Sequence, residues 1–314
     1  MINIYKTDKK NMHKVEKIDV IEKMCWIEIV NPTMEEIEYV ANETKTDINL
    51  LSKLLDDEEL PRIEIEDNST LIVIDTPYVT NNKYKHKYNT DPIGLILSDD
   101  YFITISLKDF GVFNDFKNGK IKEFDINKKT KFVIQILLRI ASIYQLELKA
   151  INADITNKEK ILYKSTNNKE LVSLLDIEKT LTYFITSLKA NDVVLEKLTK
   201  GNLIPMYEDD ADLLEDASIE NKQAIEMANI YREILTSMTD TYATIISNNL
   251  NDVMKFLAAI TIVFSVPTMI SSMLGMNVYL GKIGTDPNSF IIIIIISILL
   301  SLLLAWLFKR KGML

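Results

Sequence analysis

Two apolar segments near the C-terminus constrain the fold of this 314-residue chain more than any other feature. Residues 253–273 are apolar but include threonine, serine and proline, whereas residues 290–308 form a run without a charged residue. Because about 20 apolar residues cross the hydrocarbon core of a bilayer, both segments are predicted to be transmembrane helices. Residues 274–289 then form a loop that joins the two helices on one side of the membrane.

The charges around these segments predict the topology. Lys309, Arg310 and Lys311 follow the second segment directly, and basic residues favour the cytoplasmic side, so residues 309–314 form a basic cytoplasmic tail. Residues 1–14 are polar and lack the apolar core of a signal peptide. We therefore expect a multi-pass protein of the cell membrane, with both termini in the cytoplasm and residues 274–289 outside.

Composition and motifs exclude several classes of function. The formal net charge of −9 at pH 7 argues against a nucleic-acid surface, so no nucleic-acid partner is expected. Cys25 is the sole cysteine, which excludes a disulfide framework and a Cys-x-x-Cys metal site. The sequence contains no GxxxxGK[ST], HExxH or GxSxG motif. An enzyme and an organic cofactor are therefore not expected.

Residues 1–130 are predicted to form a small cytoplasmic α/β domain. Short runs rich in isoleucine, valine and aromatic residues predict strands at residues 24–30, 62–66, 71–75, 93–97 and 101–106. Between the first two runs, Thr33 is followed by Glu36 in a capping box, which predicts the start of a helix.

From residue 131 the apolar residues recur at helical spacings. Residues 131–164 and 168–199 predict two long amphipathic helices within a segment 131–210. No glycine or proline lies between Pro205 and Pro267, so a stalk helix over residues 211–252 should continue into the first transmembrane helix. Within the stalk, residues at alternating spacings of four and three form a coiled-coil-like seam: Ala224, Ala228, Tyr231, Leu235, Met238, Tyr242 and Ile245. The expected fold is an α+β cytoplasmic domain with long helices, followed by a stalk continuous with the first of two transmembrane helices.

Polar and small side chains form one stripe along the first apolar segment. They recur at alternating spacings of three and four, at Asn251, Met254, Ala258, Thr261, Ser265, Thr268 and Ser272. Close packing between membrane helices is one interpretation of such a stripe, and a water-facing surface is the other. One helix cannot enclose a pore, so the second interpretation requires several copies around an axis. The second segment has only Ser297 and Ser301 as polar side chains, which suits an outer helix.

The stripe contains no carboxylate, and this bears on the mechanism. Mg²⁺ loses its water reluctantly, and hydroxyl, amide and carbonyl groups can hold the hydrated ion by its outer surface. A dehydrating site would need a ring of aspartate or glutamate. If the stripe faces water, its small neutral ligands imply passive, channel-like passage down the electrochemical gradient.

The tripeptide Gly275-Met276-Asn277 directly follows the striped segment. Together with residues 251–255 and Pro267, it resembles the CorA family of magnesium transporters. Upstream stretches are similar to the cytoplasmic domain of that family, namely Trp26-Ile27-Glu28, Asn31-Pro32 and Leu60-Pro61-Arg62-Ile63-Glu64. The resemblance covers nearly the whole chain.

The resemblance implies a homopentameric funnel whose first spans line a pore and whose second spans contact lipid. It implies that Gly275, Met276 and Asn277 form the selectivity filter for hydrated Mg²⁺ at the outer mouth. Residues expected at the inner gate are Asn251, Met254 and Leu257, and Thr268 is expected in a deeper ring. Lys309, Arg310 and Lys311 would form a basic collar near the inner mouth, and membrane anchoring explains them equally well.

The chain departs from the family pattern at its outer loop and its regulatory site. Leu274 stands where the family usually has an aromatic residue, and Asp286 is the only acid of the loop. Asp216 matches a sensing acid of the family, and Asp212 lies one turn before it, so both are candidate ligands for a regulatory Mg²⁺. Residues 80–83 lack the usual partner acid. Acids at a helix start also complement the helix dipole, which is the simpler interpretation.

Two other functions remain open. One is a Zn²⁺ transporter of the same architecture, and the other is a membrane-tethered sensor that transports nothing. The related zinc branch has a different tripeptide, so Met276 favours Mg²⁺, with Co²⁺ or Ni²⁺ as further candidates.

Overall fold

The computed structural model describes residues 1–7, 15–66, 68–80, 87–164, 168–201, 203–277, 281 and 288–313. The chain folds into two compact units, Met1–Ser237 (unit 1) and Met238–Leu314 (unit 2). Unit 1 contains the sheet and the long amphipathic helices, whereas unit 2 contains the apolar helices.

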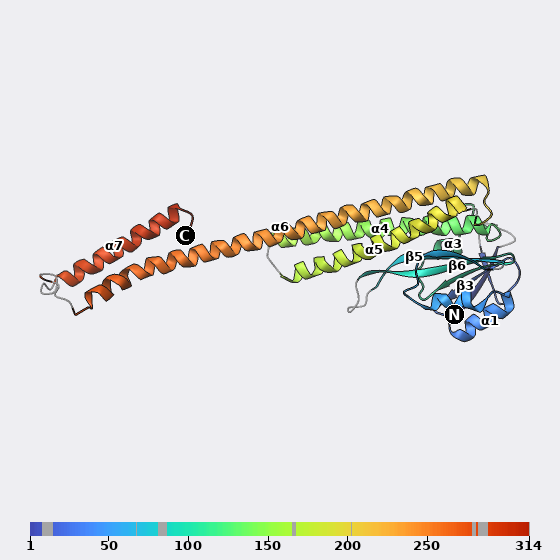
Figure 1. Cartoon of the computed structure of the whole chain (residues 1–314), viewed down its shortest axis with the longest axis horizontal. Helices are drawn as coiled ribbons and strands as arrows, with labels where there is room; N and C mark the ends of the chain where they lie inside the picture. Colours follow the sequence, from blue (N-terminus) through green and yellow to red (C-terminus); the bar gives the residue numbers. More distant parts are fainter. Residues whose placement is uncertain are drawn as a thin grey trace. The chain divides into compact units, whose positions relative to one another are not determined.

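The described strands of unit 1 form one sheet in the order β2-β1-β3-β7-β6-β5-β4. They are β1 (Ile2–Thr7), β2 (Val15–Ile18), β3 (Cys25–Val30), β4 (Arg62–Glu66), β5 (Ser69–Val79), β6 (Tyr88–Ser98) and β7 (Tyr101–Ser106). Figure 1 labels β3, β5 and β6 of this sheet. β3 pairs with β7 in parallel, and the other described pairs are antiparallel. All five predicted strands are present, and β5 and β6 extend beyond their predicted bounds. β1 and β2 were not predicted.

Helices cover both faces of the sheet (Figure 1). One face carries α1 (Met34–Thr44), α2 (Ile48–Ser52) and the 3-10 helix η1 (Lys53–Leu55), and the other carries α4 (Lys129–Lys164) and α5 (Asn168–Gly201). A short helix, α3 (Asn114–Lys117), precedes α4. The predicted capping box is present, because the Glu36 N–H donates to Thr33 Oγ1 at 3.3 Å and the Thr33 N–H donates to Glu36 Oε2 at 3.0 Å.

The face under α1 and α2 is an aliphatic core. Ile27 and Ile29 of β3 are fully buried against Ile37 and Val40 of α1. On β6, Gly94 admits Leu54, since a Cβ at position 94 would lie 2.0 Å from Leu54 Cδ1. Leu54 is 2% exposed. A side chain at position 94 would have to displace the Leu54 side chain, so glycine favours the close approach of η1 to β6.

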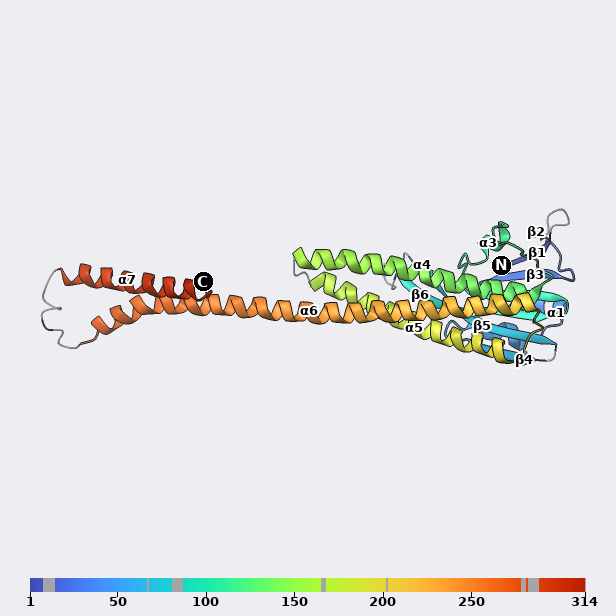
Figure 2. The same cartoon turned by 90° about the horizontal axis from the view of Figure 1, so that it is seen from above.

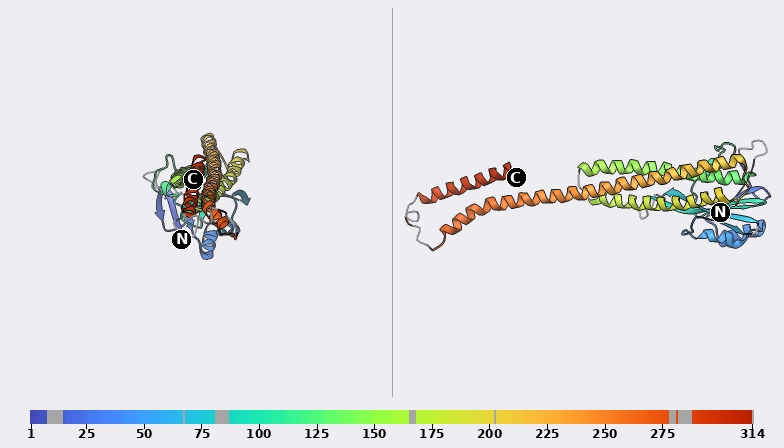
Figure 3. Two further views of the ribbon diagram at one scale, coloured as in Figure 1. Left: turned by 90° about the vertical axis from the view of Figure 1, so that its left-hand side faces the viewer. Right: turned by 45° about the horizontal axis from the view of Figure 1, so that its top comes forward.

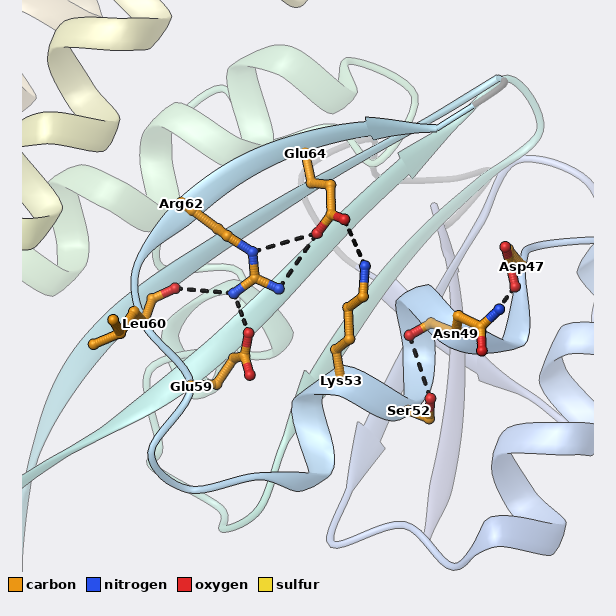
Figure 4. A network of polar contacts seen from close by, with 8 residues as sticks. All are labelled: Asp47, Asn49, Ser52, Lys53, Glu59, Leu60, Arg62 and Glu64. Atoms are coloured by element: carbon orange, nitrogen blue, oxygen red, sulfur yellow. Dashed lines mark hydrogen bonds and ion pairs between the residues drawn. The ribbon is translucent and has the colours of Figure 1, made fainter.

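Charged side chains connect η1 to the edge strand β4 (Figure 4). Arg62 forms ion pairs with Glu59 and with Glu64, and its Nε lies 3.3 Å from Glu64 Oε2. Arg62 Nη1 also donates to the Leu60 carbonyl at 3.2 Å. Lys53 reaches Glu64 from η1. All four charged side chains are partly exposed, so solvent screens each pair and its contribution to stability is small. The network positions the Leu60–Glu64 stretch and places charges on a sheet edge that could otherwise pair with another strand.

A polar contact joins β5 to α5. The Asp75 N–H donates to Asn191 Oδ1 at 2.9 Å, and Asn191 Nδ2 donates back to the Asp75 carbonyl at 2.8 Å. Burial raises the pKa of the Asp75 carboxyl above its ordinary value of 3.8, and the nearby Asp91 carboxylate adds to the rise, while a hydrogen bond from Ser187 opposes it.

Asp75→Asn should remove a pH dependence of stability. A carboxyl with a raised pKa binds its proton more tightly in the folded chain, so the free energy of unfolding falls as pH rises from about 4 through the raised value. Each unit of the rise corresponds to about 1.4 kcal/mol, and asparagine abolishes this decline. Urea unfolding of the detergent-solubilised chain between about pH 4 and about pH 8 measures it. Asp57 is exposed, so Asp57→Asn is the control, and its free energy of unfolding should change with pH as that of the wild type does. If Asp75→Asn and the wild type showed the same change with pH, the prediction would be contradicted.

One helix, α6 (Glu208–Leu274), contains both the predicted stalk and the predicted first span. It begins slightly before the predicted residue 211 and has residues in both units. Within unit 1, Ala224, Ala228 and Leu235 of the predicted seam are buried. Figure 2 shows α4 and α5 beside this part of α6. Gln145 of α4 donates to the Glu220 carbonyl at 3.0 Å, and Asn221 donates to the Leu188 carbonyl of α5 at 3.1 Å. In unit 1 the seam therefore faces helices of the same chain.

Candidate functional site

Two helices are long and apolar enough to cross a membrane among the residues described. They are α6 and α7 (Ser289–Arg310), which contain the two predicted spans. Only 6% of the most apolar stretch of each helix is buried. A surface so apolar and so exposed is stable in contact with lipid or with other apolar helices, but costly in water.

One face of α6 is covered by α7, which runs back beside it within unit 2 (Figure 3). Ala259 on α6 is fully buried and Ser297 on α7 is 7% exposed. Ser301 of α7 donates to the Val263 carbonyl of α6 at 3.4 Å. Ala259 is the one buried residue of α6 between residues 251 and 277, and the half-buried residues of this stretch lie mostly on the same side of the helix as Ala259: Ile260, Val263, Val266, Pro267, Ile270 and Leu274.

The hydroxyl-bearing stripe lies on the other side of α6. Thr261 is two residues from both Ala259 and Val263, which places it about 200° around the helix from each of them. Every predicted pore-lining residue is exposed within the chain: Asn251, Met254, Leu257, Ala258, Thr261, Ser265, Thr268 and Ser272. Packing against the chain's own α7 therefore does not account for the stripe.

Three hydroxyls of the stripe are oriented by their own helix. Thr261 donates to the Leu257 carbonyl at 2.8 Å, Ser265 to the Ile262 carbonyl at 2.8 Å and Thr268 to the Phe264 carbonyl at 3.0 Å. A hydroxyl has one proton, so each of these oxygens is left as an acceptor toward its surroundings. The exposed face of α6 therefore carries acceptor oxygens and no formal charge from residue 256 to residue 274.

The Gly-Met-Asn tripeptide begins where α6 ends. The Gly275 N–H still donates to the Ser271 carbonyl at 3.0 Å, and the Met276 N–H donates to the Met273 carbonyl at 3.4 Å. The Met276 side chain is 59% exposed, and Asn277 is exposed as well. The tripeptide thus extends directly from the last turn of α6, and all three of its residues are exposed. Residues 278–280 and 282–287 of the loop, including Asp286, lie outside the described residues.

The predicted basic collar is exposed at the end of α7. Lys309, Arg310 and Lys311 all lie on the surface of the unit. The Arg310 guanidinium lies 5.7 Å from the centre of the Trp306 ring, in cation–π contact. Tryptophan and arginine together are typical of the boundary between lipid and water.

The predicted regulatory acids lie near the start of α6. Asp210 is 4% exposed and accepts from the Tyr207 N–H at 3.2 Å, so it caps the helix. Asp212 and Asp216 are exposed one turn apart. No group of three or more histidine, cysteine or acidic side chains converges for a metal within the described part of the chain. Residues 81–83, where the usual partner acid is missing, lie outside the described residues.

A cavity of about 720 Å³ opens in unit 1, between the β6–β7 turn and the starts of α4 and α6. Its charged lining consists of Asp99, Lys128, Lys129, Lys131, Asp209 and Asp210. Lys129 donates to the Ser98 carbonyl at 2.7 Å, and burial lowers its pKa. The described lining thus carries three cationic and three anionic side chains, which gives it no net formal charge.

An α+β unit together with two exposed apolar helices is consistent with the class of integral membrane proteins. The sequence profile described as "CorA-like Mg2+ transporter protein" matches residues 22–310. The chain belongs to this CorA-like family, and the predicted family resemblance is confirmed.

Individual relatives agree over nearly the full length. The cobalt/magnesium transport protein CorA of Methanocaldococcus jannaschii is 25% identical over 99% of this chain and 99% of its own. The protein of the same name from Thermotoga maritima is 22% identical over 83% of this chain and 75% of its own. The complete structure of the M. jannaschii CorA magnesium transporter covers 100% of this chain and 99% of its own, with a TM-score of 0.87 and 23% identity. This likeness confirms the predicted α+β fold with a long helix that continues into an apolar one.

Proposed function

We propose that this protein carries hydrated Mg²⁺, and also Co²⁺, passively across the cell membrane through a pore lined by the α6 helices of several copies. The observation that carries the proposal is the uncovered stripe from Asn251 to Ser272. Membership of a family of CorA-like Mg²⁺ transporters supports it, as do the names of the two cobalt/magnesium transport relatives.

The orientation of the stripe hydroxyls suits a hydrated cation. The water molecules around Mg²⁺ turn their oxygens to the ion and their hydrogens outward, so the hydrated ion presents donors to its surroundings. Thr261, Ser265 and Thr268 use their own protons within α6 and offer acceptors. Neutral acceptors bind such an ion weakly enough to release it, as conduction requires.

The assembly that this function requires is a homopentamer. Its α6 helices surround the pore and its α7 helices face lipid, with both termini in the cytoplasm. Gly275, Met276 and Asn277 form the selectivity filter at the outer mouth, and Asn251, Met254 and Leu257 line the inner gate. Lys309, Arg310 and Lys311 form a basic collar at the inner surface. Catalysis has no part in this function.

Ion flux into proteoliposomes tests the proposal. The purified full-length protein is reconstituted, and uptake of Mg²⁺, Co²⁺ and Zn²⁺ is followed with dyes inside the vesicles. We expect uptake of Mg²⁺ and Co²⁺ down their gradients without an energy source. Uptake of Zn²⁺ alone would favour the zinc alternative, and a protein that passes no cation would favour the membrane-tethered sensor.

We further propose that Asp212 and Asp216 bind a regulatory intracellular Mg²⁺ between neighbouring copies. Both carboxylates are exposed, and carboxylate oxygens are ligands that Mg²⁺ prefers. No third acidic, histidine or cysteine side chain converges with them on the described residues of one chain, so we place the site where a second copy adds ligands. Bound Mg²⁺ then holds the copies together and keeps the pore closed until the ion is lost.

Asp212→Ala combined with Asp216→Ala is expected to abolish the protection from proteolysis that Mg²⁺ gives the wild type. Without these ligands the ion no longer holds the copies together, so digestion proceeds equally with and without Mg²⁺. Timed digestion followed by gel electrophoresis measures the effect. Glu233→Ala combined with Asp240→Ala removes two exposed acids further along α6 and should leave the protection intact. Unchanged protection in the first variant would remove both acids from regulation.

A further inference from the structure

Pro267 creates a defect in the backbone of the apolar part of α6. Proline has no N–H, so the carbonyl of Val263, four residues earlier, loses its helical donor. The ring of the proline also presses against that carbonyl and bends the helix. Figure 3 shows the bend toward the C-terminal end of α6. Where no water reaches, a carbonyl without a donor is costly, and a neighbouring helix has to supply one.

The neighbouring helix offers a hydroxyl at this carbonyl. Ser301 Oγ on α7 lies 3.4 Å from the Val263 carbonyl oxygen and 3.0 Å from the Ser297 carbonyl oxygen of its own helix. The single proton of Ser301 is therefore shared between a carbonyl that already has a helical donor and one that has lost it. Ser297, in contrast, donates only within α7, to the Ile293 carbonyl at 2.8 Å.

Two small residues near this contact are buried between the helices. Ala259, one turn before Val263, is fully buried, and Ser297, one turn before Ser301, is 7% exposed. Small side chains on both helices let the two backbones approach closely, which is how a short serine side chain can reach a carbonyl of the next helix. The Val263 carbonyl thus faces α7, while the exposed stripe lies on the other side of α6.

We infer that Ser301 is a positioning residue, whose hydroxyl replaces the donor that Pro267 removes and holds α7 against α6 at the bend. The last turns of α6, with Thr268, Ser272 and the Gly-Met-Asn tripeptide, follow this point in the chain. The bend sets the direction of these last turns, and α7 stabilises the bend from the face of α6 opposite to the stripe. This role rests on the helix contact alone and not on which ion is carried.

A double-mutant cycle separates this role from simple packing. The full-length protein in detergent is compared as wild type, Ser301→Val, Pro267→Ala and the double variant, with the thermal midpoint as the readout. We expect Ser301→Val to lower the midpoint by about 1–3 °C in the presence of Pro267. In the Pro267→Ala background the backbone supplies its own N–H to the Val263 carbonyl, so the same substitution should have no further effect. An equal loss in both backgrounds would overturn the inference.

Two controls keep the test independent of how well Pro267→Ala folds. Threonine and valine have nearly the same shape, so Ser301→Thr adds the same volume as Ser301→Val but keeps the hydroxyl. We expect Ser301→Thr to melt at least about 1 °C above Ser301→Val. Ser297→Ala removes a hydroxyl that bonds only within its own helix and should leave the midpoint unchanged. Equal midpoints for the threonine and valine variants would show that the hydroxyl has no role.

Discussion

Asn277→Ala is expected to reduce Mg²⁺ uptake into proteoliposomes by about tenfold or more, while the protein still assembles. Asn277 is the last residue of the tripeptide and the only one with a polar side chain. Its amide oxygen can accept from the water shell of the ion, and one hydrogen bond of this charge-assisted kind is worth about 1.5–3 kcal/mol. Losing it weakens binding of the hydrated ion by about tenfold or more. Because Asn277 is exposed at the end of α6, alanine there leaves no cavity in the fold.

A matched variant makes this result specific. Asn249 is also exposed on α6, and it lies about 200° around the helix from Asn251 of the stripe. Asn249→Ala should retain wild-type uptake, and size-exclusion chromatography should give both variants the wild-type elution volume. If Asn277→Ala carried Mg²⁺ at the wild-type rate, the tripeptide would have no part in selection.

α4 and α5 could be predicted from the sequence because apolar residues recur along each at helical spacing, and α7 because it is a long apolar run without a charge. α4, α5 and α7 begin and end within about two residues of their predicted bounds, the usual uncertainty of helix ends. β1 and β2 were missed for the opposite reason. Of the residues in these two strands only Ile4 is buried, and apolar residues are mixed with asparagine, lysine, threonine and glutamate, so neither strand forms a distinct apolar run. Backbone pairing with β3 keeps β1 in the sheet.

The candidate site was predictable to the extent that it lies on one helix. The spacing from Asn251 to Ser272 gives the stripe, and the structure adds that α7 covers a different face. The sequence also contains Pro267 and Ser301, but not the register between α6 and α7. Only that register brings the serine to the carbonyl that the proline frees. Contacts between copies, which the proposed pore and the proposed regulatory site both require, are not encoded in any local pattern.

The largest loss of stability is expected for Trp26→Ala in unit 1. The Trp26 side chain is fully buried, and its ring centre lies 4.9 Å from that of Tyr5, 5.1 Å from Phe132 and 5.5 Å from Phe113. Its Nε1–H donates to Thr104 Oγ1 at 2.9 Å. Alanine leaves a cavity at the junction of β3 and α4, so we expect the free energy of unfolding to fall by about 3–5 kcal/mol.

Urea unfolding of the detergent-solubilised chain, followed by circular dichroism, measures this loss as a lower midpoint for unit 1. Trp26→Phe keeps most of the ring volume and gives up the hydrogen bond to Thr104, so its loss should be smaller, about 1–3 kcal/mol. The second tryptophan supplies the control, because Trp306 is 55% exposed and belongs to unit 2. Trp306→Ala should leave the midpoint of unit 1 unchanged. If the two alanine variants unfolded at the same urea concentration, the aromatic cluster around Trp26 would not be what holds α4 to the sheet.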